Sequence, residues 1–283
     1  MTGARSLHRD LCPELLDGTA AAQQVAQQVA RQAAPQGMAD ELPTADDVAF
    51  CFYGRLFRGE EEVLATTPYL DAGDICEGLD SELLAAWWHR AAVVDDRVVP
   101  PDEEVLGRAP RWAQRAVLAL SRSRFFAPVG ERVLIGDLKQ VSAYLTDPSL
   151  RRSVQHAVSD AITADTRVVV GHSLGSVVVY EALCAHPEWP VHSLVTLGSP
   201  LGLRHLVFPR LAADPPGVWP GGVSAWTNIT DRGDVVAVEE DLRPLFGPRL
   251  RQVRIDNGVR AHDLGRYLSA AATGAAILAG FGG

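Results

Sequence analysis

Val168-Val-Val-Gly-His-Ser-Leu-Gly-Ser-Val177 joins a β-branched run to a helix-compatible run through a turn that carries one serine. The β-branched residues predict a buried strand, and residues Leu174 to Ala185 predict a packed helix. A serine at such a turn points out of the strand end on a strained backbone, and Gly171 and Gly175 leave room where a Cβ would clash with the neighbouring chain. The sequence therefore predicts Ser173 as a catalytic nucleophile, against the plainer interpretation of an ordinary glycine-rich turn.

Two carboxylates follow a second predicted strand, at residues 222–230. The strand runs into Asp231-Arg-Gly-Asp-Val-Val-Ala237, so Asp231 and Asp234 lie at or just past its carboxyl end, where an open α/β sheet builds its sites. We prefer Asp234 as the acid that holds a catalytic base, because the glycine before it permits a turn and the valines after it can anchor the loop. Asp231 is the alternative acid, or it braces the turn by accepting backbone N–H groups. Asp256 is a third candidate.

One histidine follows the last predicted strand, at residues 250–256. His262 ends a loop just before a helix that we expect to begin near Asp263, so that loop can carry its imidazole over Ser173. The near-neutral pKa of histidine suits a general base, and the order Ser, Asp, His is the one expected at a strand-to-helix elbow of this kind. A surface or helix-cap histidine is the other interpretation. His172 is not expected to be the base, because adjacent residues on so tight a turn point in different directions; we expect it to pack or to form a hydrogen bond.

Four segments around these residues together carry a resemblance to a known family: Gly171-His-Ser-Leu-Gly175, Leu194-Val-Thr-Leu-Gly-Ser-Pro-Leu-Gly202, Asp231-Arg-Gly-Asp-Val-Val-Ala237 and Ala261-His-Asp-Leu-Gly-Arg-Tyr-Leu268. The chain resembles an α/β-hydrolase of the lipase and serine-esterase type, well over roughly the last 120 of its 283 residues and loosely before them. The resemblance implies Ser173 as nucleophile, Asp234 as acid and His262 as base. It also implies that the backbone N–H of Leu174 is one donor of the oxyanion hole.

The first part of the chain departs from the pattern of that family. Such hydrolases have an early strand that ends in a His-Gly type loop, whose N–H supplies the second oxyanion donor. No such loop precedes the first predicted strand, at residues 47–54, and the chain before it predicts a helix with Pro13 in its first turn. We expect the missing strand to lie upstream, in a longer version of the chain. The alternative is that the strand at 47–54 takes the vacant place and the hole is completed differently.

The predicted fold class is α/β, a mainly parallel sheet flanked by helices, because strand and helix patterns alternate from Arg167 onward. With 283 residues, 47% of them hydrophobic, the chain can bury one core, so we expect a single domain over residues 1–283. Residues 55–129 show no clear strand and predict a helical cap, and residues 132–162 predict two helices that Pro148 divides. The aromatic residues of the cap region either line a substrate pocket or simply hold the insertion to the domain: Trp87, Trp88, Trp112, Phe125 and Phe126.

Composition narrows the possible partners. The net charge of −9 gives no reason to expect nucleic acid and disfavours an anionic membrane surface. The four cysteines lack metal-site or disulfide spacing, and no stretch reads as a signal peptide or membrane span, so a cytoplasmic protein is expected. Lys139 is the only lysine, a bias typical of GC-rich bacterial genes.

The sequence thus predicts a serine hydrolase that cleaves an ester or related acyl bond of a small molecule or lipid through an acyl-enzyme, with no metal or organic cofactor. Losing one oxyanion donor costs roughly two to three orders of magnitude in turnover, so a catalytically impaired domain used for binding or assembly is one alternative. An acyltransferase or peptidase with the same triad is another. Substrate identity and oligomeric state stay open, because a fold does not fix either of them.

Overall fold

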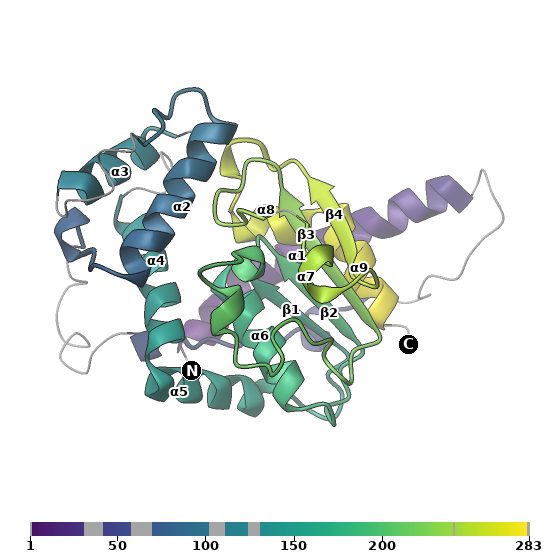
Figure 1. The fold of residues 1–283 in the computed structure, drawn as a ribbon. Helices are drawn as coiled ribbons and strands as arrows, with labels where there is room; N and C mark the ends of the chain where they lie inside the picture. The colour runs from purple at the N-terminus through teal and green to yellow at the C-terminus, as the bar shows by residue number, and fades with distance from the viewer. Residues whose placement is uncertain are drawn as a thin grey trace.

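Four strands in the described part of the chain pair in parallel, in the order β1-β2-β3-β4 (Figure 1). They are β1 Val168–His172, β2 Ser193–Leu197, β3 Ala225–Asp231 and β4 Arg251–Ile255. The computed structural model describes residues 2–30, 42–57, 70–101, 111–123, 131–239 and 241–281. Helices on both faces of the sheet, together with a helical insertion, make the α/β fold that the alternating sequence pattern predicts.

Helices make up most of the remaining described chain. The α-helices are α1 Thr2–Ala30, α2 Leu79–Val94, α3 Arg111–Ser121, α4 Glu131–Thr146, α5 Pro148–Ala161, α6 Leu174–Ala185, α7 Arg243–Phe246, α8 Leu264–Ser269 and α9 Ala271–Phe281. Short 3-10 helices lie at Ala45–Asp47, Gly54–Phe57, Ala72–Asp74, Pro200–Gly202, Phe208–Arg210 and Gly258–Arg260. Pro148 divides α4 from α5 as predicted, because Asp147 caps α5 by accepting hydrogen bonds from Ser149 N and Leu150 N.

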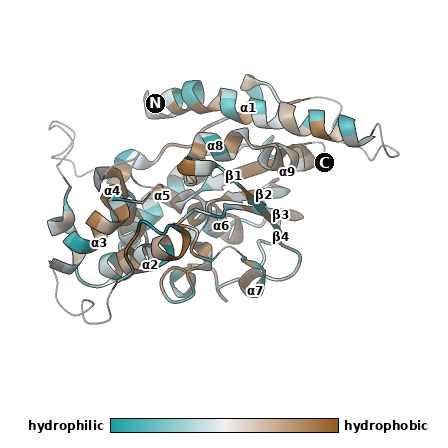
Figure 2. Ribbon diagram, turned by 90° about the horizontal axis from the view of Figure 1, so that it is seen from above, coloured by the Kyte–Doolittle hydropathy of each residue, from teal (hydrophilic) through white to brown (hydrophobic). Residues whose placement is uncertain are grey.

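The helices cover the sheet in layers (Figure 2). On one face α8 and α9 lie between the strands and α1, which crosses outside them; α6 covers the other face. The core of the first face consists of buried apolar side chains from α1, the strands, α8 and α9: Leu15, Val195, Leu197, Ile229, Tyr267, Leu268, Ala276 and Ile277. Burial of this face explains why the Ala-rich tail forms the final helix against the sheet, as the sequence predicts.

The described part of residues 55–129 contains helices and no strand, which agrees with a helical insertion. Trp87, Trp88 and Trp112 are buried in one apolar cluster that continues into α6, and Trp88 Nε1 donates to Val99 O at 2.7 Å. Their burial in this shared cluster agrees with the plainer of the two interpretations, that these aromatics hold the insertion to the rest of the domain. Phe125 and Phe126 lie outside the described residues.

Two expectations about the first part of the chain are wrong. The first helix begins at Thr2 rather than near Pro13, which lies inside α1. A proline inside a helix removes one backbone hydrogen bond, but tertiary contacts with α8 and α9 outweigh that local preference. Residues 48–53, expected within a strand, are extended but pair with no strand in the described chain.

The segment 48–53 lies beside α5, where Cys51 Sγ donates to Ala157 O at 3.4 Å. Val48 packs with the core on the α1 side, whereas Cys51 and Tyr53 pack with the core on the α6 side. The segment's backbone groups make no ladder, and a cavity of about 580 Å³ lies between this segment, the start of α1 and the end of α5. Among the described strands, β1 is at the edge of the sheet. Its valines are half-buried, whereas the sequence predicted a buried strand.

The parallel register brings the carboxyl ends of the strands to one edge. His172 pairs with Leu197, Leu197 with Ile229, and Asp231 with Ile255. The turns that follow β1, β2 and β3 therefore meet at the same end of the sheet. In the described residues, no helix is both long and apolar enough to cross a membrane.

Candidate active site

Ser173 sits at the turn between β1 and α6 in a conformation that L-residues rarely adopt. Its φ is 51° and its ψ is −128°, and it is the one non-glycine residue with positive φ in the described chain. A backbone of this kind costs on the order of 1–3 kcal/mol, which the surrounding structure must offset. The Ser173 N–H donates to Leu197 O at 3.0 Å, which ties the turn to the end of β2.

The two glycines beside Ser173 differ in how much room they leave. A Cβ at Gly171 would lie 2.6 Å from Val179 Cγ2 and 2.7 Å from Gly175 O, so only glycine fits there, as predicted. A Cβ at Gly175 would meet a single neighbouring atom, the Tyr53 hydroxyl oxygen, at 3.3 Å. The predicted clash is therefore severe at Gly171 and much weaker at Gly175.

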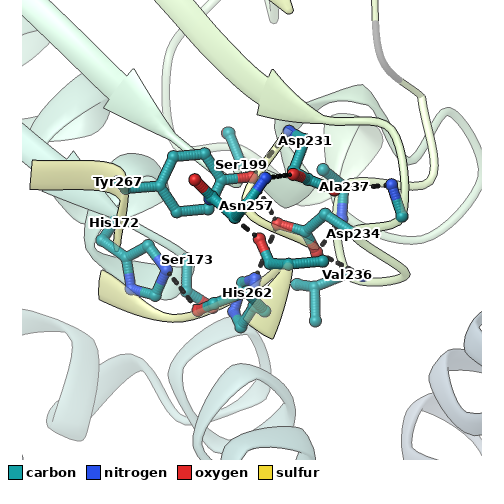
Figure 3. Close-up of polar contacts among 12 residues, drawn as sticks. His172, Ser173, Ser199, Asp231, Asp234, Val236, Ala237, Asn257, His262 and Tyr267 are labelled. Carbon is teal, nitrogen blue, oxygen red and sulfur yellow. Dashed lines mark hydrogen bonds and ion pairs between the residues drawn. The ribbon is translucent and has the colours of Figure 1, made fainter. Parts of the chain in front are cut away.

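His262 and Asp234 form a hydrogen-bonded pair at the same edge of the sheet (Figure 3). The distance from His262 Nδ1 to Asp234 Oδ2 is 2.8 Å, and the Asp234 side chain is fully buried. The second carboxylate oxygen accepts hydrogen bonds from Val236 N at 3.0 Å and Ala237 N at 3.3 Å, which fix its orientation. His262 is placed by the loop after β4, one residue before Asp263 caps α8 by accepting from Arg266 N.

The other two candidate aspartates do not pair with His262. Asp231 accepts hydrogen bonds from Gly233 N, at 2.7 Å, and from Asn257 N, so it braces the turn after β3 and ties it to the chain after β4. Asp256 accepts a hydrogen bond from Gly258 N at 2.9 Å. The structure therefore brings Asp234, and neither alternative, to the imidazole.

The His262 imidazole lies against His172, the residue directly before Ser173. Its ring centroid is 4.6 Å from that of His172, whose Nε2 is 3.1 Å from His262 O, so His172 packs and forms a hydrogen bond as expected. With Nδ1–H donating to Asp234, Nε2 is an acceptor; this atom is buried and has no partner in the described chain. Among the described residues, no hydrogen bond joins Ser173 to His262.

Gly198, which the sequence analysis did not single out, makes the close approach of these groups possible. It follows β2 directly and has a φ of 53°. A Cβ there would lie 2.6 Å from Asp234 Oδ2 and 3.1 Å from His262 Nδ1. Ser173 N donates to the carbonyl oxygen of Leu197, the residue directly before Gly198. Gly198 therefore lies between the serine turn and the acid–base pair.

Tyr267 is a second residue that sequence reasoning missed. Its hydroxyl donates to Asp234 Oδ2 at 2.7 Å and accepts from Asp231 N at 2.8 Å, so one buried group bridges both aspartates. It lies in the segment 261–268 already noted for its resemblance, but no local signal marks a tyrosine on α8 for this contact.

The electrostatics of the pair follow from burial and from its contacts. Burial alone would raise the pKa of Asp234, but the His262 charge and the hydrogen bonds from His262 and Tyr267 lower that pKa below its ordinary value. Burial would lower the pKa of His262, yet the carboxylate of Asp234 raises that pKa above its ordinary value. Burial, together with the His262 charge, lowers the pKa of His172 to about 3, so His172 stays neutral near pH 7.

The helical region before β1 contributes a further charge to the site. Burial raises the pKa of Asp137, on α4, while the charge of His262 acts to lower it. The same interaction adds to the rise in the His262 pKa. No group of three or more His, Cys, Asp or Glu side chains in the described ranges is arranged to hold a metal ion.

A strained serine, an acceptor imidazole nitrogen and a buried carboxylate are the parts that nucleophilic acyl chemistry needs. The Leu174 N–H, the first of α6, has no acceptor within its own helix, because the first N–H groups of a helix lie before its hydrogen-bond ladder. Comparison of the chain with protein-family models, curated proteins and solved structures finds no match.

Proposed function

We propose that this chain is a serine hydrolase of the α/β-hydrolase type, similar to lipases and serine esterases, that cleaves an ester or related acyl bond. The observation that carries the proposal is the coincidence of a strained serine at a strand-to-helix turn with a buried His–Asp pair beside it. Glycine-rich turns are common, but this backbone strain next to an oriented imidazole is a feature of functional sites.

The proposed reaction proceeds in two steps. Ser173 Oγ attacks the carbonyl carbon of the substrate while its proton passes to His262 Nε2, and Asp234 stabilises the imidazolium that forms. The bond to the leaving group breaks, the leaving group takes the proton from Nε2, and an acyl-serine remains. Water then gives a proton to Nε2 and attacks the acyl-serine, which releases the acid and restores the Ser173 hydroxyl.

The Leu174 N–H is proposed as a donor to the oxyanion in both tetrahedral states. Its position directly after the nucleophile is the one from which a backbone donor serves such an anion, and the α6 dipole adds to the attraction. The substrate class is a small-molecule or lipid ester. The proposed steps need no metal or organic cofactor, because proton transfer and anion binding are both supplied by the chain.

Hydrolysis of p-nitrophenyl esters of different acyl length by wild type and by Ser173→Ala tests the proposal. We expect measurable wild-type turnover, and a fall to the background rate in a folded Ser173→Ala variant, because the nucleophile is lost. Full esterase activity in Ser173→Ala would remove the assignment. Amide substrates and an added alcohol acceptor in the same assay distinguish a peptidase or an acyltransferase from an esterase.

A non-catalytic, hydrolase-like binding domain is the second candidate. It is favoured by one observation: beside the Leu174 N–H, the described residues contain no second backbone N–H that the sequence or the fold marks as an oxyanion donor. Wild type that is folded but inert toward activated esters would favour this candidate.

A further inference from the structure

The hydroxyl of Tyr53 lies over the first turn of α6, two residues beyond the proposed nucleophile. It is the one atom within 4 Å of the position that a Cβ on Gly175 would occupy, at 3.3 Å, apart from the chain next to that glycine. Leu174, directly after the proposed nucleophile, is the first residue of the same helix. The Tyr53 hydroxyl therefore lies close to the helix turn that begins at Ser173 and Leu174, although Tyr53 is far from both in sequence.

The Tyr53 side chain is held in place at its ring and left without a partner at its oxygen. The ring packs in the core cluster on the α6 side of the sheet and contacts the Phe57 ring, with centroids 6.3 Å apart. Two residues earlier, Cys51 Sγ donates to Ala157 O at 3.4 Å and anchors the segment to α5. No hydrogen bond engages the Tyr53 hydroxyl in the described chain, and the residue as a whole is half-buried, so this oxygen is not one of the fully buried polar atoms without a partner.

The environment keeps this hydroxyl protonated. Burial, with a smaller contribution from Cys51, raises the pKa of Tyr53 above its ordinary value. The group is therefore a hydrogen-bond donor over the whole range in which an esterase operates. A positioned donor without a partner in the fold is what electrostatic stabilisation of a developing anion uses, and tyrosine hydroxyls serve in such holes.

We propose that the Tyr53 hydroxyl is the second donor of the oxyanion hole, acting together with the Leu174 N–H. This inference rests on the proposed serine-hydrolase function. As the substrate carbonyl becomes tetrahedral, its oxygen accepts hydrogen bonds from both groups, and Tyr53 keeps its proton throughout. The donor that the sequence pattern lacks thus comes from a side chain on the unpaired segment 48–53 rather than from a backbone loop.

Tyr53→Phe removes only the oxygen, so it tests the proposal with little change in shape. We expect kcat for p-nitrophenyl acetate to fall about a hundredfold, with KM changed less than about threefold, because the interaction is made in the transition state. The thermal midpoint should stay the same or rise, since the lost hydroxyl has no partner in the fold. Tyr180→Phe is the matched control: it removes the hydroxyl that donates to Val218 O at 2.8 Å and should leave kcat unchanged.

A second readout separates oxyanion binding from a general disturbance of the site. Sulfur accepts hydrogen bonds poorly, so the rate advantage of an ester over its thionoester should shrink in Tyr53→Phe, whereas a displaced Ser173 or His262 would slow both substrates alike. A folded Tyr53→Phe with wild-type kcat and an unchanged ester-to-thionoester ratio overturns this inference and leaves the hydrolase intact. If wild type itself neither hydrolyses esters nor reacts with a fluorophosphonate, the proposed function fails and this inference fails with it.

Discussion

Replacing Asp234 by asparagine is the sharpest test of how the His262 imidazole is oriented. The carboxylate accepts at Oδ2 from His262 Nδ1, at 2.8 Å, and at Oδ1 from the backbone N–H groups of residues 236 and 237. Those backbone donors should hold the amide oxygen of the asparagine at the Oδ1 position. The amide NH₂ group then faces His262 Nδ1, which must become an acceptor, and the ring proton moves to Nε2.

An imidazole with its proton on Nε2 cannot accept the proton of Ser173. Wrong-tautomer substitutions of this kind in serine hydrolases lower kcat by about 10⁴, equivalent to about 5 kcal/mol of transition-state stabilisation. Loss of the carboxylate charge acts in the same direction, because a fully buried Asp234 stabilises the imidazolium in a medium with little screening. We therefore expect kcat/KM of Asp234→Asn to fall by about four orders of magnitude.

Asp231→Asn is the matched control, a substitution of the same chemistry three residues away. Asp231 accepts backbone hydrogen bonds from Gly233 and Asn257 and does not contact the imidazole, so we expect a loss of stability of about 1–3 kcal/mol and less than a tenfold loss of kcat. The assay is kcat/KM for p-nitrophenyl acetate, with the thermal midpoint of each variant measured to confirm folding.

The opposite pattern would refute this reasoning. If folded Asp231→Asn loses about four orders of magnitude while Asp234→Asn stays within tenfold of wild type, Asp231 is the acid and the observed pair is structural. Equal and small effects in both variants would mean that no carboxylate orients the base.

Two other predictions concern the charge and the packing of the same pair. Catalysis needs neutral His262, and the pKa of His262 is raised, so kcat/KM should rise with pH through an apparent pKa above about 6.5. Asp137→Asn removes a charge that raises this pKa, so it should shift the rise in kcat/KM to lower pH. An unchanged pH profile in this variant would exclude an interaction between Asp137 and His262. Protonated His262 also stabilises the folded state, fully below about pH 6.5, and this contribution is lost as the pH rises through the folded-state pKa. The free energy of unfolding of wild type and of His262→Ala, measured by denaturant titration at several pH values, tests this dependence. Gly198→Ala should lower the free energy of unfolding by at least about 1–2 kcal/mol and reduce kcat, because the new methyl group would lie 2.6 Å from Asp234 Oδ2 on a backbone with positive φ. Gly136→Ala is the control: this position on α4 has no neighbouring atom within 4 Å, so the substitution should raise the thermal midpoint. Equal midpoints for the two glycine variants would contradict the close packing around Gly198.

The parts of the fold that the sequence predicted are those decided by local chemistry. The helix from Leu174 to Ala185 has the predicted bounds because a strained turn begins it, and α8 begins after Asp263 because that side chain caps it. The strands β3 and β4 follow from their β-branched runs and the turns that flank them. Asp234 and His262 were nominated from turn chemistry and chain order, and the structure brings their side chains together.

The parts that were missed depend on contacts between distant segments. Residues 48–53 are a continuous apolar run that is typical of a strand, but a strand exists only with a neighbour to pair with, and the run does not reveal whether one is within reach. The helix start at Thr2 was missed because Pro13 is locally unfavourable and only packing against α8 and α9 offsets it. Tyr267, Gly198 and Tyr53 carry no local signature, since each matters through what it touches across the fold.

The central claim, that Ser173 is an activated nucleophile, is tested most directly by mapping the adduct of a fluorophosphonate on the folded protein by mass spectrometry. The account predicts a single adduct on the peptide that contains Ser173, absent in Ser173→Ala and formed far more slowly in Asp234→Asn. A folded wild-type chain that takes up no fluorophosphonate, or that carries the adduct on a different residue, would contradict it.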